Sequence, residues 1–444
     1  MSRYIERMGL RTSSALLIRP GNIFNPFVLS RSTVLTTGLS KHEWIEWPST
    51  RPLVLSNAEG AGRTGFRLYR AASIVLAITG FITAADAATL QVGADKKYLS
   101  PSVAAKFARD GDIVEIDAGV YPKDAAVWKQ NNLTLRGVGG MAHLQADGAN
   151  VAGKGIWLIK GNNITIENIE FSGAKVRDRN GAGVRAEGTG LTIRNCYFHD
   201  NQNGILSGSH KDSDIVVENS EFANNGAGDG KTHNMYIGSV RSFTLKYSYS
   251  HHSRIGHTVK TRAQTNYILY NRIMDEFDGN SSYNIDIANG GIAYVIGNLV
   301  QQGQISENSG IISYGAEGLK YDANEFYLIN NTVVNERPQG GTFVFVKPGT
   351  NLARIVNNLF IGRGMINAAG AEQSNNVRGD KNELISPLAY DYHLRLKAEA
   401  VNAGIDPGTA NDFSLRPTEQ YVHKAGSEPR PVVGKVDVGA YEHQ

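Results

Sequence analysis

Apolar and polar residues alternate in short segments that recur along the chain from residue 164 onward. Most segments consist of two short alternating runs with an Asn between them. They are ITIENIEF (164–171), LTIRNCYF (191–198), IVVENSEF (215–222), FTLKYSYS (243–250), YILYNRIM (267–274), YVIGNLVQ (294–301), YLINNTVV (327–334) and ARIVNNLF (353–360). Aligned on positions 168, 195, 219, 247, 271, 298, 331 and 358, they carry Asn everywhere except at Tyr247, and their spacing ranges from 24 to 33 residues.

The two-residue alternation within each segment and the repeat of 24 to 33 residues between segments together predict an all-β fold. The fold expected is a right-handed parallel β-helix built from successive coils. One coil cannot bury its own apolar face, whereas stacked coils bury a continuous column of Ile, Val and Leu. We expect the recurrent Asn to adopt the left-handed bend at one corner and to hydrogen-bond to the Asn of the next coil. The two-residue period excludes helical repeats, and propeller units are longer, at about 40–45 residues.

The flanking segments predict how the solenoid ends. Residues 98–121 predict a short amphipathic helix followed by a strand, and the helix would cap the open apolar end of the coil stack. The C-terminal stretch, which closes with KVDVGAYEH, is less regular, and we expect it to wrap the far end.

The N-terminal region has the features of a signal peptide. Arg63, Arg67 and Arg70 precede an apolar run over 71–83, and a small-x-small site follows at 85–87. The run is too short to span a bilayer. We therefore expect a leader over 1–62 that is mis-assigned or disordered, a signal peptide over 63–87 and a single β-helix domain over 88–444. The mature protein would be secreted or periplasmic, with no membrane attachment after cleavage.

Composition and charge exclude several classes of protein. The chain has 49 Gly but only 13 Pro, at 41% hydrophobic residues, which excludes collagen-like and low-complexity chains. Residues 88–444 hold 35 basic and 37 acidic residues, a net charge of −2, so bulk charge gives no support for nucleic-acid binding. The single cysteine, Cys196, excludes a disulfide framework and a Cys-based zinc site, and we expect it in the core.

Segments near the two ends carry a family resemblance. DGDIVEIDAGVY and VDVGAYE resemble the corresponding end segments of the pectin-lyase-like β-helix superfamily, and the resemblance covers about 89–444. That superfamily includes lyases, hydrolases, epimerases and esterases, so the fold alone does not select an activity.

Titratable residues concentrate on three consecutive predicted coils. In HNMYIG (233–238), GHTVKTR (256–262) and YNIDIANG (283–290), alternation predicts that Asn234, Tyr236, Lys260, Arg262, Asn284 and Asp286 face outward. Tyr236, Lys260 and Asp286 are spaced by 24 and 26 residues, so they would stack on one face at about 5 Å per coil. The adjoining turns carry His233, His251, His252, His257, Asp275, Glu276 and Asp278.

This set of residues suits β-elimination on a uronic-acid polymer. That reaction needs a group that neutralises the carboxylate, a base for the C5 proton and an acid for the leaving oxygen. Arg262 would lower the pKa of Lys260 and bind the carboxylate in two-pronged fashion, while Tyr236 or His257 would transfer protons. We expect the substrate-binding residues to be His233, Asn234, His251, His252, Asp278, Asn284 and Asp286.

Two narrower resemblances point the same way. Chondroitinase-B-type lyases use a Lys and an Arg on such a surface, and Lys260 and Arg262 are the matching residues, although here both lie on one strand. The segment from 236 to 263 resembles mannuronan C5-epimerases, with Arg262 at the position of a family Arg. However, HNMY replaces the Asp-Pro-His-Asp stretch of that family.

Several alternatives remain open at this point. A glycoside hydrolase would use carboxylates from Asp275, Glu276, Asp278 and Asp286. A non-catalytic carbohydrate-binding β-helix needs only an outward face, and a solvated face would show ion pairs such as Lys260 with Asp286. Calcium could bind Asp275, Glu276 and Asp278.

The preferred interpretation is that the protein is a monomeric lyase of acidic polysaccharide. If so, we expect Lys260→Ala and Arg262→Ala each to abolish activity without lowering thermal stability.

Overall fold

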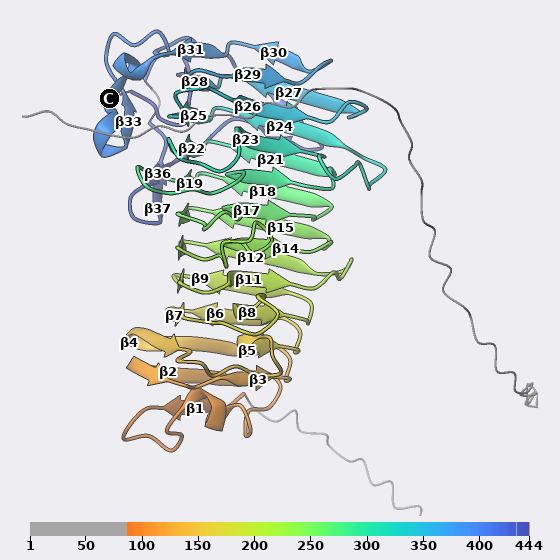
Figure 1. The fold of residues 1–444 in the computed structure, drawn as a ribbon, viewed down its shortest axis with the longest axis vertical. Coiled ribbons are helices and arrows are strands. Elements are labelled where there is room, and N and C mark those ends of the chain that lie inside the picture. Colours follow the sequence, from red (N-terminus) through yellow and green to blue (C-terminus); the bar gives the residue numbers. More distant parts are fainter. Residues whose placement is uncertain (1–86, 432, 444) are drawn as a thin grey trace, which may run out of the picture. The chain divides into compact units, whose positions relative to one another are not determined.

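The computed structural model describes residues 87–431 and 433–443, which belong to one compact unit, Phe81–Gln444. The predicted leader (1–62) lies outside the described residues, as does the predicted signal peptide (63–87) except for Ala87. Within the described part, parallel strands stack coil upon coil, as the sequence predicts (Figure 1). No helix in this part combines the length and the hydropathy that crossing a membrane requires.

The coils contribute strands to two parallel sheets. The ten-stranded sheet is formed by β3 (Ala126–Trp128), β5 (Gly155–Ile159), β8 (Ala182–Ala186), β11 (Asn203–Ser207), β14 (Met235–Ile237), β17 (Val259–Thr261), β20 (Ile285–Ile287), β23 (Gly310–Tyr314), β26 (Thr342–Val346) and β29 (Met365–Asn367).

The second sheet has 21 strands. It opens with β1 (Thr89–Val92), β2 (Ile113–Pro122) and β4 (Thr134–Gln145). One series then continues through β6 (Ile164–Glu167), β9 (Leu191–Arg194), β12 (Asp214–Glu218), β15 (Ser242–Lys246), β18 (Thr265–Leu269), β21 (Ile292–Ile296), β24 (Glu325–Ile329), β27 (Leu352–Val356) and β30 (Glu372–Ser374). The other runs through β7 (Ile169–Ser172), β10 (Tyr197–His199), β13 (Glu221–Ala223), β16 (Tyr249–His251), β19 (Arg272–Met274), β22 (Leu299–Gln302), β25 (Thr332–Asn335), β28 (Leu359–Gly362) and β31 (Val377–Gly379).

Inward-facing side chains form a continuous column between the sheets. Phe171, Phe198 and Phe222 stack coil on coil, with ring centroids 5.0 and 4.8 Å apart. Cys196 is 1% exposed in the same core, as expected from its lack of a partner cysteine. Burial raises the pKa of its thiol to about 12. Such stacking buries the apolar face that a single coil would leave in water.

The N-terminal end holds a short helix, as expected. α1 (Pro101–Ala104) is a single turn that begins with Pro at a position where its missing N–H costs nothing. Ala104, Ala105 and Ala108 are buried at this end of the main core.

The recurrent Asn positions occupy two adjacent columns rather than one. Asn168, Asn195 and Asn219 have positive φ, but the register continues that column through Tyr247 and Tyr270. The later aligned residues, Asn271, Asn298, Asn331 and Asn358, are each one position beyond the bend and are buried. Each accepts hydrogen bonds from the equivalent residue of the preceding coil, so these four form a ladder of hydrogen bonds between coils. The residue immediately before each of them in the sequence makes the left-handed turn. The expectation that one Asn column does both was therefore wrong.

The C-terminal segment folds back along the coils instead of only wrapping the far end. It comprises the 3-10 turns η1 (Lys381–Glu383) and η2 (Pro387–Ala389) and the strands β32 (Leu384–Ser386), β33 (Asp391–Leu394), β34 (Thr409–Ala410), β35 (Phe413–Ser414), β36 (Glu419–Val422) and β37 (Gly426–Pro429). Asn219 donates to the Ala425 carbonyl at 3.1 Å, and Lys424 forms an ion pair with Glu221 on β13. The tail therefore covers coils some 200 residues earlier in the chain.

Candidate active site

Three predicted residues stand in one row across neighbouring strands of the ten-stranded sheet. Tyr236 on β14 is in register with Lys260 on β17, and Lys260 is in register with Asp286 on β20. The neighbours in this row are Leu206 on the preceding coil and Ser313 on the following one. Tyr236, Lys260 and Asp286 thus stack on three consecutive coils, as the spacing of 24 and 26 residues predicts, and Arg185 on β8 continues the row beyond Leu206.

Lys260 is nearly enclosed, with 6% of its surface exposed. Its Nζ lies 2.9 Å from Asp286 Oδ2 and 2.7 Å from Glu317 Oε1. Burial alone would lower the pKa of Lys260, but the Asp286 charge and the hydrogen bond to Glu317 outweigh it, so the pKa is raised. The expectation that Arg262 lowers this pKa was wrong, because two carboxylates lie closer to the ammonium group.

Arg262 follows β17 and holds three groups together. Its Nε donates to Tyr236 Oη at 2.8 Å, its NH1 donates to Asn289 Oδ1 at 3.0 Å, and it pairs with Glu317. The guanidinium also lies 5.5 Å from the centre of the Tyr236 ring, a cation–π distance. Tyr236 and Arg262 therefore act as one unit at the edge of the row.

Glu317 completes the cluster, although the sequence pattern does not predict it as a site residue. It lies in the turn after β23, where the regular coil spacing gives no position for it. One carboxylate oxygen meets Lys260 and the other meets Arg262. Burial opposes ionisation, but these two cations lower the pKa of Glu317 to about 2. The only sequence signal was the carboxylate in ISYGAEG, 312–318.

His233 and His257 stack beside this row, with ring centroids 4.7 Å apart and planes 6° apart. The His257 main-chain N–H donates to His233 Nδ1 at 2.9 Å, and the Tyr283 N–H donates to His257 Nδ1 at 3.2 Å. Because Nδ1 is an acceptor in both rings, the proton of each neutral imidazole is on Nε2. Burial lowers the pKa of His257 to about 4 and that of His233 well below its usual value.

His257 Nε2 lies 3.5 Å from Asp286 Oδ2, which already accepts from Lys260. The other oxygen, Asp286 Oδ1, is buried with no hydrogen-bond partner among the described residues. The Ser313 hydroxyl, on the strand that pairs with β20, is also buried without such a partner. Two buried polar groups without a hydrogen-bond partner among the described residues, Asp286 Oδ1 and the Ser313 hydroxyl, therefore lie at this end of the row.

Two predicted outward residues face the core instead. Asn234 and Asn284 are fully buried. Asn234 accepts from Asn225 at 3.0 Å and donates to the His251 carbonyl at 2.8 Å, while Asn284 donates to the Gln301 carbonyl at 3.1 Å. Both lie in the bend just before their strand, where two-residue alternation does not yet apply. The expectation that they face outward was wrong.

The remaining predicted site residues lie around the corner of the coil. His251 on β16 contacts Glu221 at 3.2 Å, and His252 contacts Asp278 at 3.1 Å. These two histidines and Asp278 belong to the side of the 21-stranded sheet, so the structure does not bring them to the Tyr236 row.

The three carboxylates suggested for calcium are engaged separately. Asp275 is fully buried and accepts from Ser281, Ser306 and the Gly303 N–H, and burial raises its pKa. Glu276 accepts from Tyr249, whereas Asp278 is largely exposed beside His252. Among the described residues these three form no converging metal-binding group.

Comparison with known proteins supports the fold. Residues 119–300 match the family described as the right handed beta helix region. A solved structure of pectate lyase Pel9A aligns with a TM-score of 0.56 at 12% identity, covering 80% of this chain and 96% of that one. No curated protein sequence matches the chain.

Two further solved structures align less well. Geobacillus virus E2 ORF18 has a TM-score of 0.40 at 15% identity, covering 61% of this chain and 53% of that one. The pectin methylesterase from Aspergillus niger has a TM-score of 0.30 at 12% identity, covering 66% and 83%. The coil geometry, the family match over residues 119–300 and the Pel9A alignment together show that this chain has a right-handed parallel β-helix fold.

Proposed function

We propose that this chain is a secreted or periplasmic enzyme that cleaves an acidic, uronic-acid-containing polysaccharide by β-elimination. The observation that carries the proposal is the position of Glu317. One of its carboxylate oxygens pairs with Lys260 and the other with Arg262. A uronate carboxylate can make the same two contacts with Lys260 and Arg262. The likeness in fold to a pectate lyase is consistent with such a substrate.

In the proposed complex, the substrate carboxylate takes the place of the Glu317 carboxylate. Glu317 can yield this place because 43% of its side chain is exposed, whereas only 7% of Lys260 is. Lys260 and Arg262 then neutralise the carboxylate, which stabilises the negative charge that develops when the C5 proton leaves.

Tyr236 is the proposed proton-transfer group. Its Oη accepts from Arg262 Nε at 2.8 Å, so its own proton is free to point toward substrate. The hydroxyl first gives this proton to solvent; the resulting phenolate removes the C5 proton, the C4–C5 double bond forms, and the C4–oxygen bond breaks. The leaving oxygen then takes a proton back from the Tyr236 hydroxyl, which balances the step. Lys260 is not assigned as the base, because its raised pKa keeps it protonated.

His233 and His257 take the role of hydrogen-bond donors in this proposal. Their Nδ1 atoms are occupied by main-chain N–H groups, and their Nε2 atoms carry the proton. A group in this state donates a hydrogen bond but offers no free lone pair for a proton. We therefore assign His257 to positioning of Asp286 and substrate rather than to general base catalysis.

A hydrolase fits this geometry less well. Glycoside hydrolysis needs one carboxyl group with a raised pKa to protonate the leaving oxygen. In the cluster, the cations lower the pKa of Glu317 to about 2. Asp275, whose pKa is raised, is fully enclosed by the protein.

The test is the ultraviolet absorbance of unsaturated products during incubation with a panel of uronic-acid polymers. We expect absorbance to rise for one of them, and Tyr236→Phe to slow the rise by about 10²- to 10⁴-fold. Arg262→Ala should be similarly impaired, because it both binds the carboxylate and holds Tyr236.

Arg241→Ala is the matched control. Arg241 lies near the same coils but pairs with exposed Asp214 on the other sheet, so its loss should leave the rate unchanged. Wild-type rates in both Tyr236→Phe and Arg262→Ala would place the chemistry elsewhere. A change of uronate configuration without absorbance would indicate epimerisation instead of elimination.

A further inference from the structure

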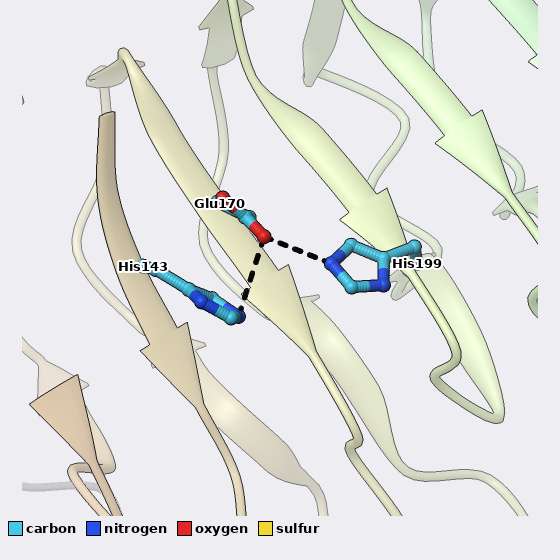
Figure 2. Close-up of side chains that lie close together, drawn as sticks. All are labelled: His143, Glu170 and His199. Carbon is cyan, nitrogen blue, oxygen red and sulfur yellow. Dashed lines mark hydrogen bonds and ion pairs between the residues drawn. The ribbon is translucent and has the colours of Figure 1, made fainter. Parts of the chain in front are cut away.

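A second cluster of titratable side chains lies on the outer face of the 21-stranded sheet. It consists of His143 on β4, Glu170 on β7 and His199 on β10, which are adjacent strands of three coils (Figure 2). His143 and Glu170 are directly in register, and His199 is two positions further along its strand than the partner of Glu170. This cluster is separate from the Tyr236 row, which belongs to the ten-stranded sheet.

The three side chains converge on one point. Glu170 Oε1 lies 3.4 Å from His143 Nε2 and 3.0 Å from His199 Nε2, and all three ligand atoms lie within 4.8 Å of one another. In a tetrahedral zinc site with bonds of 2.0–2.1 Å, ligand atoms are about 3.3 Å apart. The two distances to Glu170, 3.4 and 3.0 Å, are close to this spacing. Figure 2 shows both contacts as dashed lines.

Hydrogen bonding at His199 calls for a positive charge beside these atoms, which a bound cation would supply. His199 Nδ1 contacts Asp200 Oδ2 at 2.9 Å, and Nε2 contacts Glu170 Oε1. A neutral imidazole has one N–H and cannot donate to both carboxylates. When Nδ1–H donates to Asp200, the Nε2 lone pair faces a carboxylate oxygen, and a metal ion between the two atoms satisfies both.

The surroundings also resemble the outer shell of a metal site. A carboxylate on the far nitrogen of a ligating His fixes its ring and increases its basicity, and Asp200 has this position. Asp200 is itself held by Arg254 at 2.6 Å. The Ser172 hydroxyl lies 2.7 Å from His143 Nε2, so it would have to move aside or join the coordination.

The donor set selects the kind of metal. Two imidazole nitrogens and one carboxylate oxygen suit Zn²⁺, whereas Ca²⁺ and Mg²⁺ prefer oxygen ligands alone. About a fifth to a quarter of each side chain is exposed, so the remaining position would face solvent. We propose that His143, Glu170 and His199 bind one Zn²⁺ ion on the outer face of the first coils, with an open coordination position.

The experiment is titration of the chelator-treated full chain with ZnCl₂ by calorimetry. We expect one saturable site per chain, abolished in His199→Ala and Glu170→Gln. Asp200→Asn should weaken the affinity about 10- to 100-fold, the effect expected for a group that only orients a ligand. CaCl₂ should neither bind this site nor compete with zinc.

His210→Ala is the control, because His210 is exposed on a loop outside the cluster. Unchanged circular dichroism in each variant separates loss of binding from loss of fold. The proposal is overturned if the wild-type chain shows no saturable zinc binding. It is also overturned if His199→Ala binds as tightly as the wild type.

Discussion

The imidazoles of His233 and His257 show how main-chain contacts fix side-chain chemistry. Each Nδ1 accepts from an N–H of a neighbouring residue or coil, and each ring is buried. Protonation would require the second N–H to face a donor, so both rings stay neutral in the fold. In an unfolded chain they would titrate near pH 6.5.

This difference predicts loss of stability in mild acid. The pKa of His257 is about 4 in the folded state, so between pH 6.5 and 4 the unfolded chain binds more protons, and stability falls as pH falls. His257→Gln should remove about 2–3 kcal/mol of the loss between pH 7 and 4.5, measured by urea unfolding. Glu317, with its pKa of about 2, contributes mainly below this window. An unchanged pH dependence in His257→Gln would contradict the assignment.

Burial of Lys260 changes what its removal should do. Lys260→Ala leaves Asp286, whose side chain is 3% exposed, with only His257 at 3.5 Å. An uncompensated buried charge costs about 3–5 kcal/mol, so we expect lower thermal stability, contrary to the hypothesis drawn from sequence. The double variant Lys260→Met/Asp286→Leu should recover most of this loss, because no lone charge remains. Equal destabilisation of the single and double variants would show that the charge pair is not the cause.

Residue-level prediction from sequence succeeded where alternation within a strand applies. Tyr236, Lys260 and Asp286 lie inside strands, and their register follows from the coil length. Asn234 and Asn284 precede their strands, where the bend turns the side chain inward. Glu317 comes from a turn whose path depends on the folded coil, so no periodic pattern predicts it.

At the level of elements, the two Asn columns have different roles at each corner. One makes the left-handed bend and the other forms the hydrogen-bond ladder between coils. The left-handed position tolerates Asn, Tyr or Gly, since Tyr247, Tyr270 and Gly297 also occupy it. From Asn271 onward the ladder position carries an amide, and Asn298 both accepts from the Asn271 amide at 3.0 Å and donates to Asn331 at 2.9 Å. On the earlier coils Ser220 and Ser248 accept only the main-chain N–H bond. A sequence alignment could not separate these columns, because Asn is common in both and the offset is one residue.

The ladder position should be the more sensitive of the two. Asn298→Ala leaves the buried N–H of Asn271 and the Ile268 carbonyl without their partner, so we expect a loss of at least about 2 kcal/mol. Asn195→Gly, at an exposed left-handed bend, should change stability by less than about 0.5 kcal/mol, because Gly adopts positive φ freely. Urea denaturation of both variants measures the difference, and similar losses would mean that the two columns are equivalent.

At the level of the whole described unit, the C-terminal segment secures the coils from outside. Arg430 is 7% exposed, pairs with Glu442 at 2.8 Å and donates to four main-chain carbonyls nearby. Burial lowers the pKa of Arg430 and raises that of Glu442, yet their pairing keeps both charges in place. The Arg430–Glu442 pair belongs to the irregular C-terminal segment and not to the repeat. Sequence periodicity therefore predicts only an approximate position for this segment.

We expect Arg430→Ala to lower the free energy of unfolding by about 3–5 kcal/mol, because Glu442 would be left buried without its partner. Arg363→Ala, at an exposed position, serves as the control and should be close to neutral. Thermal unfolding of both variants measures the contrast. A small effect of Arg430→Ala would mean that the tail is held chiefly by its apolar contacts.

The most direct measurement is a crystal structure of Tyr236→Phe, which should bind but not cleave, in complex with a uronic-acid oligosaccharide. We predict a sugar carboxylate between Lys260 and Arg262, with Glu317 displaced and the sugar C5 facing the position of the missing hydroxyl. An oligosaccharide bound on another face, or one whose carboxylate avoids both cations, would contradict it.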